Sequence, residues 1–122
     1  MWLKTIETEN IIFSYFYKNE DKKEVELSTL MNYVSALQEK FCEQNELVYI
    51  NYTRTSLINA IMLHLDLFDL DNNTIRIISD IKKISCRIEF YNSKLPYEIR
   101  KDYMKFFEDV DREIKSSTLV CA

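Results

Sequence analysis

The only stretch of the sequence with the spacing of metal ligands begins at Asp69. Counted from there, oxygen-bearing side chains stand at the first, third, fifth and twelfth positions, as in a calcium-binding loop. These side chains belong to Asp69, Asp71, Asn73 and Asp80. The sixth position, where such a loop needs glycine, holds Thr74, and the twelfth holds Asp instead of the usual Glu. The stretch therefore predicts a polar turn with local Asp and Asn hydrogen bonds, and no metal or cofactor is expected.

His64 is the only histidine, and it lies among leucines on a predicted core helix. One imidazole can serve as a general base, but it needs a positioned partner and a nucleophile or substrate. The sequence shows neither, so His64 is expected to be a packed or half-exposed side chain. The chain is therefore not expected to be an enzyme, and no catalytic residue is predicted.

The three cysteines are widely spaced and odd in number, which favours free thiols in a reduced, cytoplasmic compartment. Cys42 belongs to the apolar stripe of a predicted helix, and Cys86 lies on the apolar face of a predicted strand. Both are expected to be small core residues, as is common for free cysteine.

Acidic and aromatic side chains favour a binding function. Residues 1–71 carry twelve acidic and six basic side chains, within a net charge of −4 for the whole chain. An acidic surface attracts basic proteins and repels nucleic acid. The eight tyrosines and seven phenylalanines exceed what one core of this size needs, and aromatic side chains are typical anchors of protein interfaces. The predicted protein-binding residues are Glu39, Glu43, Glu46, Tyr49, Tyr52, Asp66, Asp69 and Asp71.

Glycine is absent from the chain. Phosphate-binding loops, dinucleotide fingerprints and nucleophile elbows require glycine where the backbone approaches a ligand or turns sharply, so these sites are excluded. Tight hairpin turns must use Asn or Asp instead. No apolar run reaches the about 18 residues of a membrane span, and the first residues do not read as a secretory signal. The abundance of Ile, Asn, Lys and Tyr suggests AT-rich coding DNA, as in many bacteria, phages and some viruses.

The longest apolar region, residues 47–70, is expected to form the centre of the fold. Alternation over 48–53 predicts a strand, and Thr53 is one candidate cap for the helix that follows. Two apolar rows at helical spacing predict that this helix covers 55–65 and is buried on more than one side. It is expected to end before most of Asp66, Asp69 and Asp71, because acids are unfavourable at the C-terminal end of a helix. The rows are Leu57 with Ile61, and Ile58 with Met62 and Leu65. A strand is the alternative for 63–67, because leucines alternate there.

Periodicity predicts one α+β domain over 1–115, followed by a frayed tail at 116–122. The predicted strands cover 11–17, 23–27, 48–53, 74–79 and 84–91, the first two forming a hairpin, with a short strand or an irregular lead-in over 2–7. The predicted helices cover 28–45, 55–65 and 96–115. Together they predict an antiparallel or mixed sheet of four to five strands packed with two to three helices.

By elimination, the sequence favours a small acidic protein-binding module. The size and charge of the chain are typical of immunity or inhibitor proteins that occlude a basic toxin or nuclease. This comparison is with a class of proteins and rests on no shared motif. Two alternatives remain open. One is a self-assembling structural or regulatory subunit that dimerises through aromatic side chains, and the other is a small metal-dependent enzyme that uses Asp66, Asp69 and Asp71. The few basic side chains near 76–87 are weak support for nucleic-acid binding.

Overall fold

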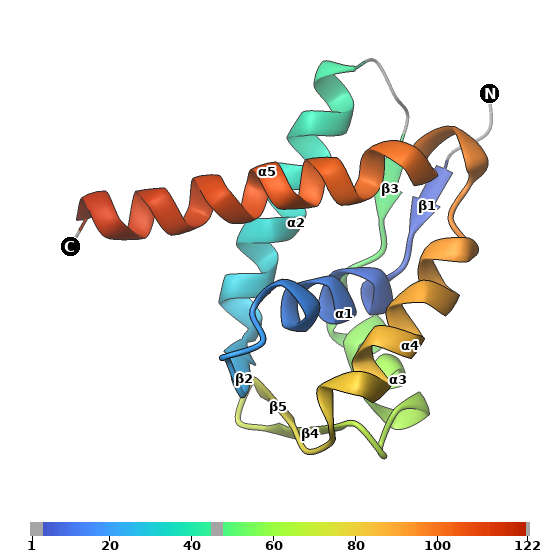
Figure 1. The fold of residues 1–122 in the computed structure, drawn as a ribbon, viewed down its shortest axis with the longest axis vertical. Helices are drawn as coiled ribbons and strands as arrows, with labels where there is room; N and C mark the ends of the chain where they lie inside the picture. Colours follow the sequence, from blue (N-terminus) through green and yellow to red (C-terminus); the bar gives the residue numbers. More distant parts are fainter. Residues whose placement is uncertain (1–3, 45–47, 122) are drawn as a thin grey trace.

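The computed structural model describes residues 4–44 and 48–121, which contain five helices and five short strands (Figure 1). The strands are β1 (Lys4–Ile6), β2 (Glu24–Glu26), β3 (Val48–Ile50), β4 (Phe68–Asp71) and β5 (Thr74–Ile77). The helices are α1 (Thr8–Lys18), α2 (Leu27–Glu43), α3 (Arg54–Leu63), α4 (Ile81–Ser93) and α5 (Tyr97–Cys121). None of these helices combines the length and apolar character needed to cross a membrane.

The strands form two separate small sheets. β1 pairs with β3 in parallel, with Lys4 opposite Val48. The other three strands form an antiparallel sheet in the order β2-β5-β4. The prediction of a single sheet of four to five strands with two to three helices is therefore wrong. Two of its predicted strands, at 11–17 and 84–91, are helices.

The stretch 11–17 belongs to α1, the buried helix at the centre of the fold. Every residue from Asn10 to Phe16 is buried. A run of consecutive apolar residues fits both a strand covered on two faces and a helix covered all round, and periodicity alone does not separate them. The neighbours decide, because α2, α3, α4 and α5 all contact α1. The predicted hairpin of 11–17 with 23–27 is wrong, and α1, rather than 47–70, organises the core.

The stretch 84–91, predicted as the strongest strand, belongs to α4. Asp80 is the N-cap of this helix, and its carboxylate accepts a backbone hydrogen bond from the first turn. Ile84 and Ile88, one helical turn apart, are buried, whereas Cys86 between them is exposed. Residues four positions apart satisfy both a period of two and a helical period, which is why the sequence pattern was ambiguous.

The start and the end of α3 and the turn behind it agree with the predictions, whereas β4 was not predicted. Thr53 caps α3 by accepting a hydrogen bond from the backbone N–H of Ser56 at 3.0 Å, and the helix ends at Leu63, before the acids that follow. β4 and β5 then form a hairpin around Asn72 and Asn73, whose φ angles are 50° and 65°. Asn tolerates this left-handed conformation better than most residues other than glycine. The predicted Asn/Asp turn is confirmed.

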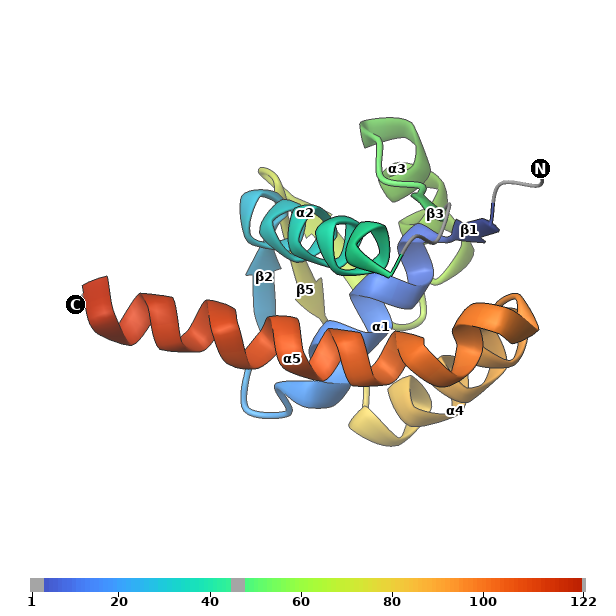
Figure 2. The ribbon, with the colours of Figure 1, turned by 90° about the horizontal axis from the view of Figure 1, so that it is seen from above.

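α2 and α5 pack against each other and against α1 (Figure 2). The predicted apolar stripe of α2 is largely confirmed, because Leu30, Leu37 and Phe41 are buried. The buried face of α5 contains Ile99, Tyr103, Phe107 and Val110. Phe106, which helical spacing from Ile99 and Tyr103 predicts to be buried, is half-buried at the edge of this face. Cys42 on α2 is exposed like Cys86, so the prediction of two core cysteines is wrong.

α5 is longer than its apolar pattern predicted. It continues to Cys121, through residues that the sequence predicted as a tail. Its last turns extend beyond the other elements (Figure 1), where no neighbouring helix of the described chain covers them. The apolar stripe ends near Ile114. The apolar periodicity of the sequence therefore predicted only the part of α5 that packs on other helices and did not predict the part that projects.

Candidate functional site

The predicted acidic binding residues lie at two ends of the molecule. Glu39 and Glu43 are exposed on the last turns of α2. α2 begins beside β2 and runs away from the β2-β5-β4 sheet (Figure 1), over about 25 Å for its 17 residues. The acids near that sheet are Asp66, Asp69 and Asp71, all exposed. Glu46 lies outside the described residues. The described acids therefore form two groups rather than one face.

The two predicted tyrosine anchors have different environments. Tyr49 is exposed on β3, between the buried side chains of Val48 and Ile50. Tyr52 is half-buried, and its hydroxyl donates a hydrogen bond to the backbone carbonyl of Leu27 at 3.4 Å. Burial raises the pKa of Tyr52 to about 12. Tyr52 thus joins the segment before α3 to the start of α2. Of the two tyrosines, Tyr49 is the one whose exposed side chain could contact a partner protein.

An exposed apolar row runs along α3 and the turn behind it. Met62 is 63% exposed, Leu63 is 69% exposed and Leu65 is 56% exposed, and Ile58 one turn earlier is exposed as well. The opposite side of the helix is core and contains Leu57, Ala60 and Ile61. The prediction that both rows are buried is therefore wrong. We call Ile58, Met62, Leu63 and Leu65 the α3 surface.

Carboxylates border the α3 surface. The acids that follow it are Asp66, Asp69 and Asp71. No lysine or arginine occurs between Arg54 and Arg76 in the sequence. Asp66 forms an ion pair with Arg87 of α4, with 2.9 Å between Oδ2 and Nη2. The other two acids form no ion pair with any residue of the described chain. The sequence that follows the α3 surface is therefore acidic, with Asp66 paired to Arg87 and Asp69 opposite Arg76 across the hairpin; we call these three acids the acidic border.

His64 joins α3 to α4 beside this surface. It is the C-cap residue of α3 and only 7% exposed. Arg87 Nη1 lies 2.5 Å from His64 Nδ1, and because a guanidinium only donates, Nδ1 must accept. The proton of the neutral ring is therefore on Nε2, which donates to the Tyr91 hydroxyl at 2.9 Å. Phe13 of α1 packs against the ring edge-on, with 5.1 Å between ring centroids.

These contacts keep His64 neutral. Burial lowers the pKa of His64, and the Arg87 guanidinium lowers it further, against an opposite effect of Asp66. Arg87 holds both partners at once, because its second terminal nitrogen binds the Asp66 carboxylate. Both nitrogens of the imidazole are engaged with the protein, so His64 positions the end of α3 and has no nitrogen left for a substrate. The prediction of a packed histidine is confirmed.

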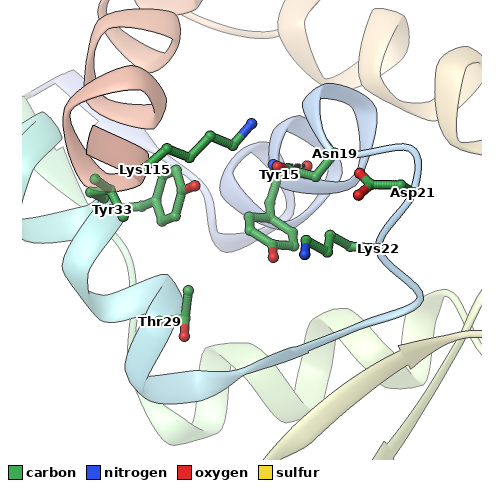
Figure 3. A pocket seen from close by; sticks show the side chains of 8 residues that line it. Tyr15, Asn19, Asp21, Lys22, Thr29, Tyr33 and Lys115 are labelled. Atoms are coloured by element: carbon green, nitrogen blue, oxygen red, sulfur yellow. Dashed lines mark hydrogen bonds between the residues drawn. The ribbon is translucent and has the colours of Figure 1, made fainter. Parts of the chain in front are cut away.

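A pocket of about 450 Å³ opens between the end of α1, the segment before β2, the start of α2 and α5 (Figure 3). Its lining includes Tyr15, Lys22, Thr29, Tyr33, Ile114 and Lys115. The rings of Tyr15 and Tyr33 meet edge-on there, with 5.5 Å between centroids. These residues come from three distant segments of the chain, so no local sequence signal could have predicted the pocket.

The buried carboxylate of Asp111 ties together the helices around this pocket. It is 8% exposed. It accepts hydrogen bonds from the Tyr33 hydroxyl at 2.7 Å and from Asn19 Nδ2 at 3.3 Å, and it pairs with Lys115 at 3.0 Å. Burial raises the pKa of Asp111, but these donors outweigh burial and hold the pKa below its ordinary value. The i, i+4 spacing of Asp111 and Lys115 alone predicts an ion pair on the wet face of a helix; the pair is present, but Asp111 is buried.

The described residues form no metal centre. Among them, no three His, Cys, Asp or Glu side chains gather closely enough to hold a metal ion. The segment from Asp69 to Asn73 is one strand and the turn of a β-hairpin, with its carboxylates exposed. The alternative of a metal-dependent enzyme built on Asp66, Asp69 and Asp71 gains no support from this geometry.

Comparison with known proteins identifies no relative. No family model, no curated protein and no solved structure matches the chain. A fold alone does not specify a function, which depends on the chemistry of particular side chains. What the chain does must therefore be inferred from its own surfaces and pockets.

Proposed function

We propose that this chain is a protein-binding module whose α3 surface holds a basic partner protein. The observation that carries this proposal is the row of large apolar side chains left exposed on a helix whose other side is core. Folded domains rarely expose a contiguous apolar patch unless another molecule covers it. Aliphatic side chains such as Met62 and Leu65 would be desolvated at the centre of such a contact.

The charge beside the α3 surface selects a basic partner. The acidic border is formed by Asp66, Asp69 and Asp71, and the whole chain carries a net charge of −4. Carboxylates at the rim of an apolar contact attract an oppositely charged protein before contact and exclude acidic competitors. The apolar row therefore contributes most of the affinity, and the acidic border increases the rate of association and the specificity for a basic partner.

The contacts of His64 prepare this surface for binding. Because Arg87 holds both His64 and Asp66, the end of α3 and the first acid of the border are fixed before a partner arrives. A preorganised surface loses less conformational entropy when it binds, so more of its contact energy appears as affinity.

The specific form of this function that we propose is an inhibitor or immunity protein that covers a basic toxin or nuclease. An enzyme that acts on nucleic acid presents a basic surface to its anionic substrate. A small acidic domain with an apolar row can occupy that surface and block the substrate. The small size and acidity of this chain support this form of the proposal.

The test compares variants of the α3 surface with a matched control. The double variant Met62→Ser with Leu65→Ser shortens the exposed row, and Met31→Ser removes an exposed apolar side chain from α2. All three positions are exposed, so each change is expected to alter the free energy of unfolding by only about 0.5 kcal/mol. Circular dichroism and thermal melting of each protein check this before binding is measured.

Partners captured on the wild-type chain are then identified, purified and titrated. The proposal predicts one basic protein that binds the wild type and Met31→Ser equally, and the double variant about tenfold more weakly or worse. Equal binding to all three proteins, or an acidic partner, would contradict it. A wild-type homodimer in analytical ultracentrifugation that the double variant abolishes would assign the α3 surface to self-assembly instead.

A further inference from the structure

The pocket between α1, α2 and α5 is separate from the α3 surface, because its described lining contains no residue of α3. Its volume of about 450 Å³ lies within the range of small-molecule sites, about 300–1,000 Å³. The rings of Tyr15 and Tyr33 and the side chain of Ile114 make its lining mostly apolar. A pocket of this size and lining fits one small ring-containing molecule.

Three polar groups of the lining have no protein partner within the described chain. They are the hydroxyls of Tyr15 and Thr29 and the ammonium group of Lys22. Figure 3 shows the Lys22 side chain running toward Tyr15. All three groups can donate hydrogen bonds, and burial raises the pKa of Tyr15, so its hydroxyl stays protonated at neutral pH. Three donors, one of them charged, favour an anionic ligand group.

The carboxylate of Asp111 is largely compensated by its own partners, but burial and then the charges of Asp111 and Asp21 raise the pKa of Tyr15. The oxygens of Asp111 are already engaged by Tyr33, Asn19 and Lys115. Asp111 is not part of the described lining, whose one carboxylate is that of Asp21, and Asp21 forms no ion pair with Lys22. Lys115 is engaged by Asp111, so the exposed Lys22, which forms no ion pair within the described chain, is the cation that the lining offers to a ligand.

We propose that this pocket binds a small aromatic carboxylate. Its ring packs against Tyr15, Tyr33 and Ile114, where aromatic rings favour edge-on and offset contacts. Its carboxylate accepts hydrogen bonds from the Lys22 ammonium and the Tyr15 hydroxyl, with Thr29 as a third donor. Hydrogen bonds between ionised partners are about twice as strong as neutral ones, so the Lys22 contact contributes most to selection of the acid. This site does not depend on the protein partner proposed for the α3 surface.

The probes are 4-hydroxyphenylacetate and its neutral amide, which differ only at the carboxylate. Each is titrated into the full chain up to about 10 mM, a range that detects millimolar dissociation constants. The ring resonances of Tyr15 and Tyr33 are followed by NMR. The acid should shift these resonances saturably, and the amide should bind about tenfold more weakly. Failure of the acid to bind, or equal binding of the amide, would overturn the proposal.

Two lysine variants separate the site from general charge. Lys22→Gln is expected to weaken binding of the acid by about tenfold and to leave the amide almost unaffected. Lys23→Gln removes the same charge one residue away, at an exposed position outside the lining, and should change neither. Equal effects of the two variants on the acid would show a non-specific attraction and overturn the site.

Thr29→Phe tests the cavity itself, because the larger side chain fills part of it. This variant should abolish binding of both probes while its melting temperature shows that it is folded. Met31→Phe, on the exposed face of the same helix, is its control and should bind both probes as the wild type does. Binding of the acid to folded Thr29→Phe with wild-type affinity would place the probe elsewhere and overturn the proposal.

Discussion

At the scale of single residues, two buried polar side chains join the helices. His64 takes partners from α4 and packs on α1, and Asp111 takes partners from α2 and from Asn19, the C-cap residue of α1. A buried polar group stabilises a fold only when its hydrogen bonds are satisfied, because an unsatisfied one costs its desolvation energy. Each cluster therefore stabilises the observed packing of the helices over alternative packings, in which these hydrogen bonds would be lost.

Lowering the pH is expected to destabilise the protein through His64. The pKa of His64 is lowered in the folded state, whereas in the unfolded chain it is about 6.5. Below about pH 6.5 the unfolded state therefore binds more protons. The stability contributed by neutral His64 is complete above that pH and is lost as the pH falls toward the folded pKa.

Urea unfolding of the wild type and of His64→Gln between about pH 8 and about pH 5 measures this effect. The difference in the free energy of unfolding between the two proteins should shrink as the pH falls, because only the wild type loses the contribution of His64. Carboxylates such as Glu9 titrate in both proteins and cancel. A difference that stays constant with pH would show that His64 is not held neutral by the fold.

Removal of the Tyr33 hydroxyl is expected to destabilise the protein. Tyr33→Phe keeps the ring and deletes one donor to the buried Asp111 carboxylate, which should cost about 1–3 kcal/mol. Tyr17→Phe is the matched control, because Tyr17 is an exposed tyrosine of α1 whose hydroxyl donates no hydrogen bond within the described chain. Chemical denaturation of both variants measures the two costs, and similar values would show that Asp111 does not need this bond.

At the scale of elements, α3 and α4 each have one face in the core and one face outside. On α3 the outer face carries the apolar row of the α3 surface beside the exposed polar residues Arg54, Thr55 and Asn59. On α4 the outer face is mixed and includes Cys86 and the half-exposed Phe90, over which the Lys94 ammonium lies 4.3 Å from the ring centroid. The two helices meet at His64, so the exposed faces share a fixed orientation.

Substitutions on α4 distinguish its helix from the strand that alternation predicts. Ile88→Ala removes a buried side chain and should cost about 2–5 kcal/mol. Cys86→Ala changes an exposed side chain and should alter the free energy of unfolding by about 0.5 kcal/mol or less. In a strand the two residues would share one face and cost similar amounts. The free energy of unfolding of each variant, obtained from the midpoint and slope of its denaturant curve, decides between these outcomes.

At the scale of the whole molecule, the two proposed sites lie on different sides of α1. The α3 surface is next to the β2-β5-β4 sheet, and the pocket lies where α1, α2 and α5 meet. The acids divide in the same way, since Glu39 and Glu43 lie at the far end of α2 from Asp69 and Asp71 (Figure 1). Reversing charge at one end or the other therefore gives two variants with the same net charge and different distances from the α3 surface.

Charge reversal beside the α3 surface is expected to slow association with the basic partner. Asp69→Lys with Asp71→Lys should lower the association rate constant by about tenfold at low salt, because steering is strongest near the contact. Glu39→Lys with Glu43→Lys, the control with the same net charge, should lower it less. Stopped-flow or surface-binding kinetics at several salt concentrations measure both. The difference in association rate constant between the two double variants should disappear near about 0.1 M salt, where the screening length falls to about 10 Å. Equal effects of the two double variants at low salt would show that the partner does not bind at the α3 surface.

The sequence alone determined the elements whose signals are local. The cap at Thr53, the end of α3 before its acids, the Asn72–Asn73 turn and the buried stripe of α2 follow from neighbouring residues within one or two turns. Each depends on a backbone hydrogen bond, a permitted φ angle or a single periodic face, and such effects act over a few residues. The absence of glycine likewise excluded whole classes of site without any structure.

Only the tertiary structure decided which faces are covered and which distant side chains meet. The apolar runs of α1 and α4 fit a strand or a helix equally until the surrounding helices are known, because burial depends on neighbours rather than on period. The second row of α3 has the same composition whether it is core or surface, and here no described element covers it. Asp111 reads as a wet helix residue in the sequence because its partners Tyr33 and Asn19 are 78 and 92 positions away. Contacts between such distant positions form only when the helices pack, so the pocket and the α3 surface are properties of the fold rather than of any local pattern.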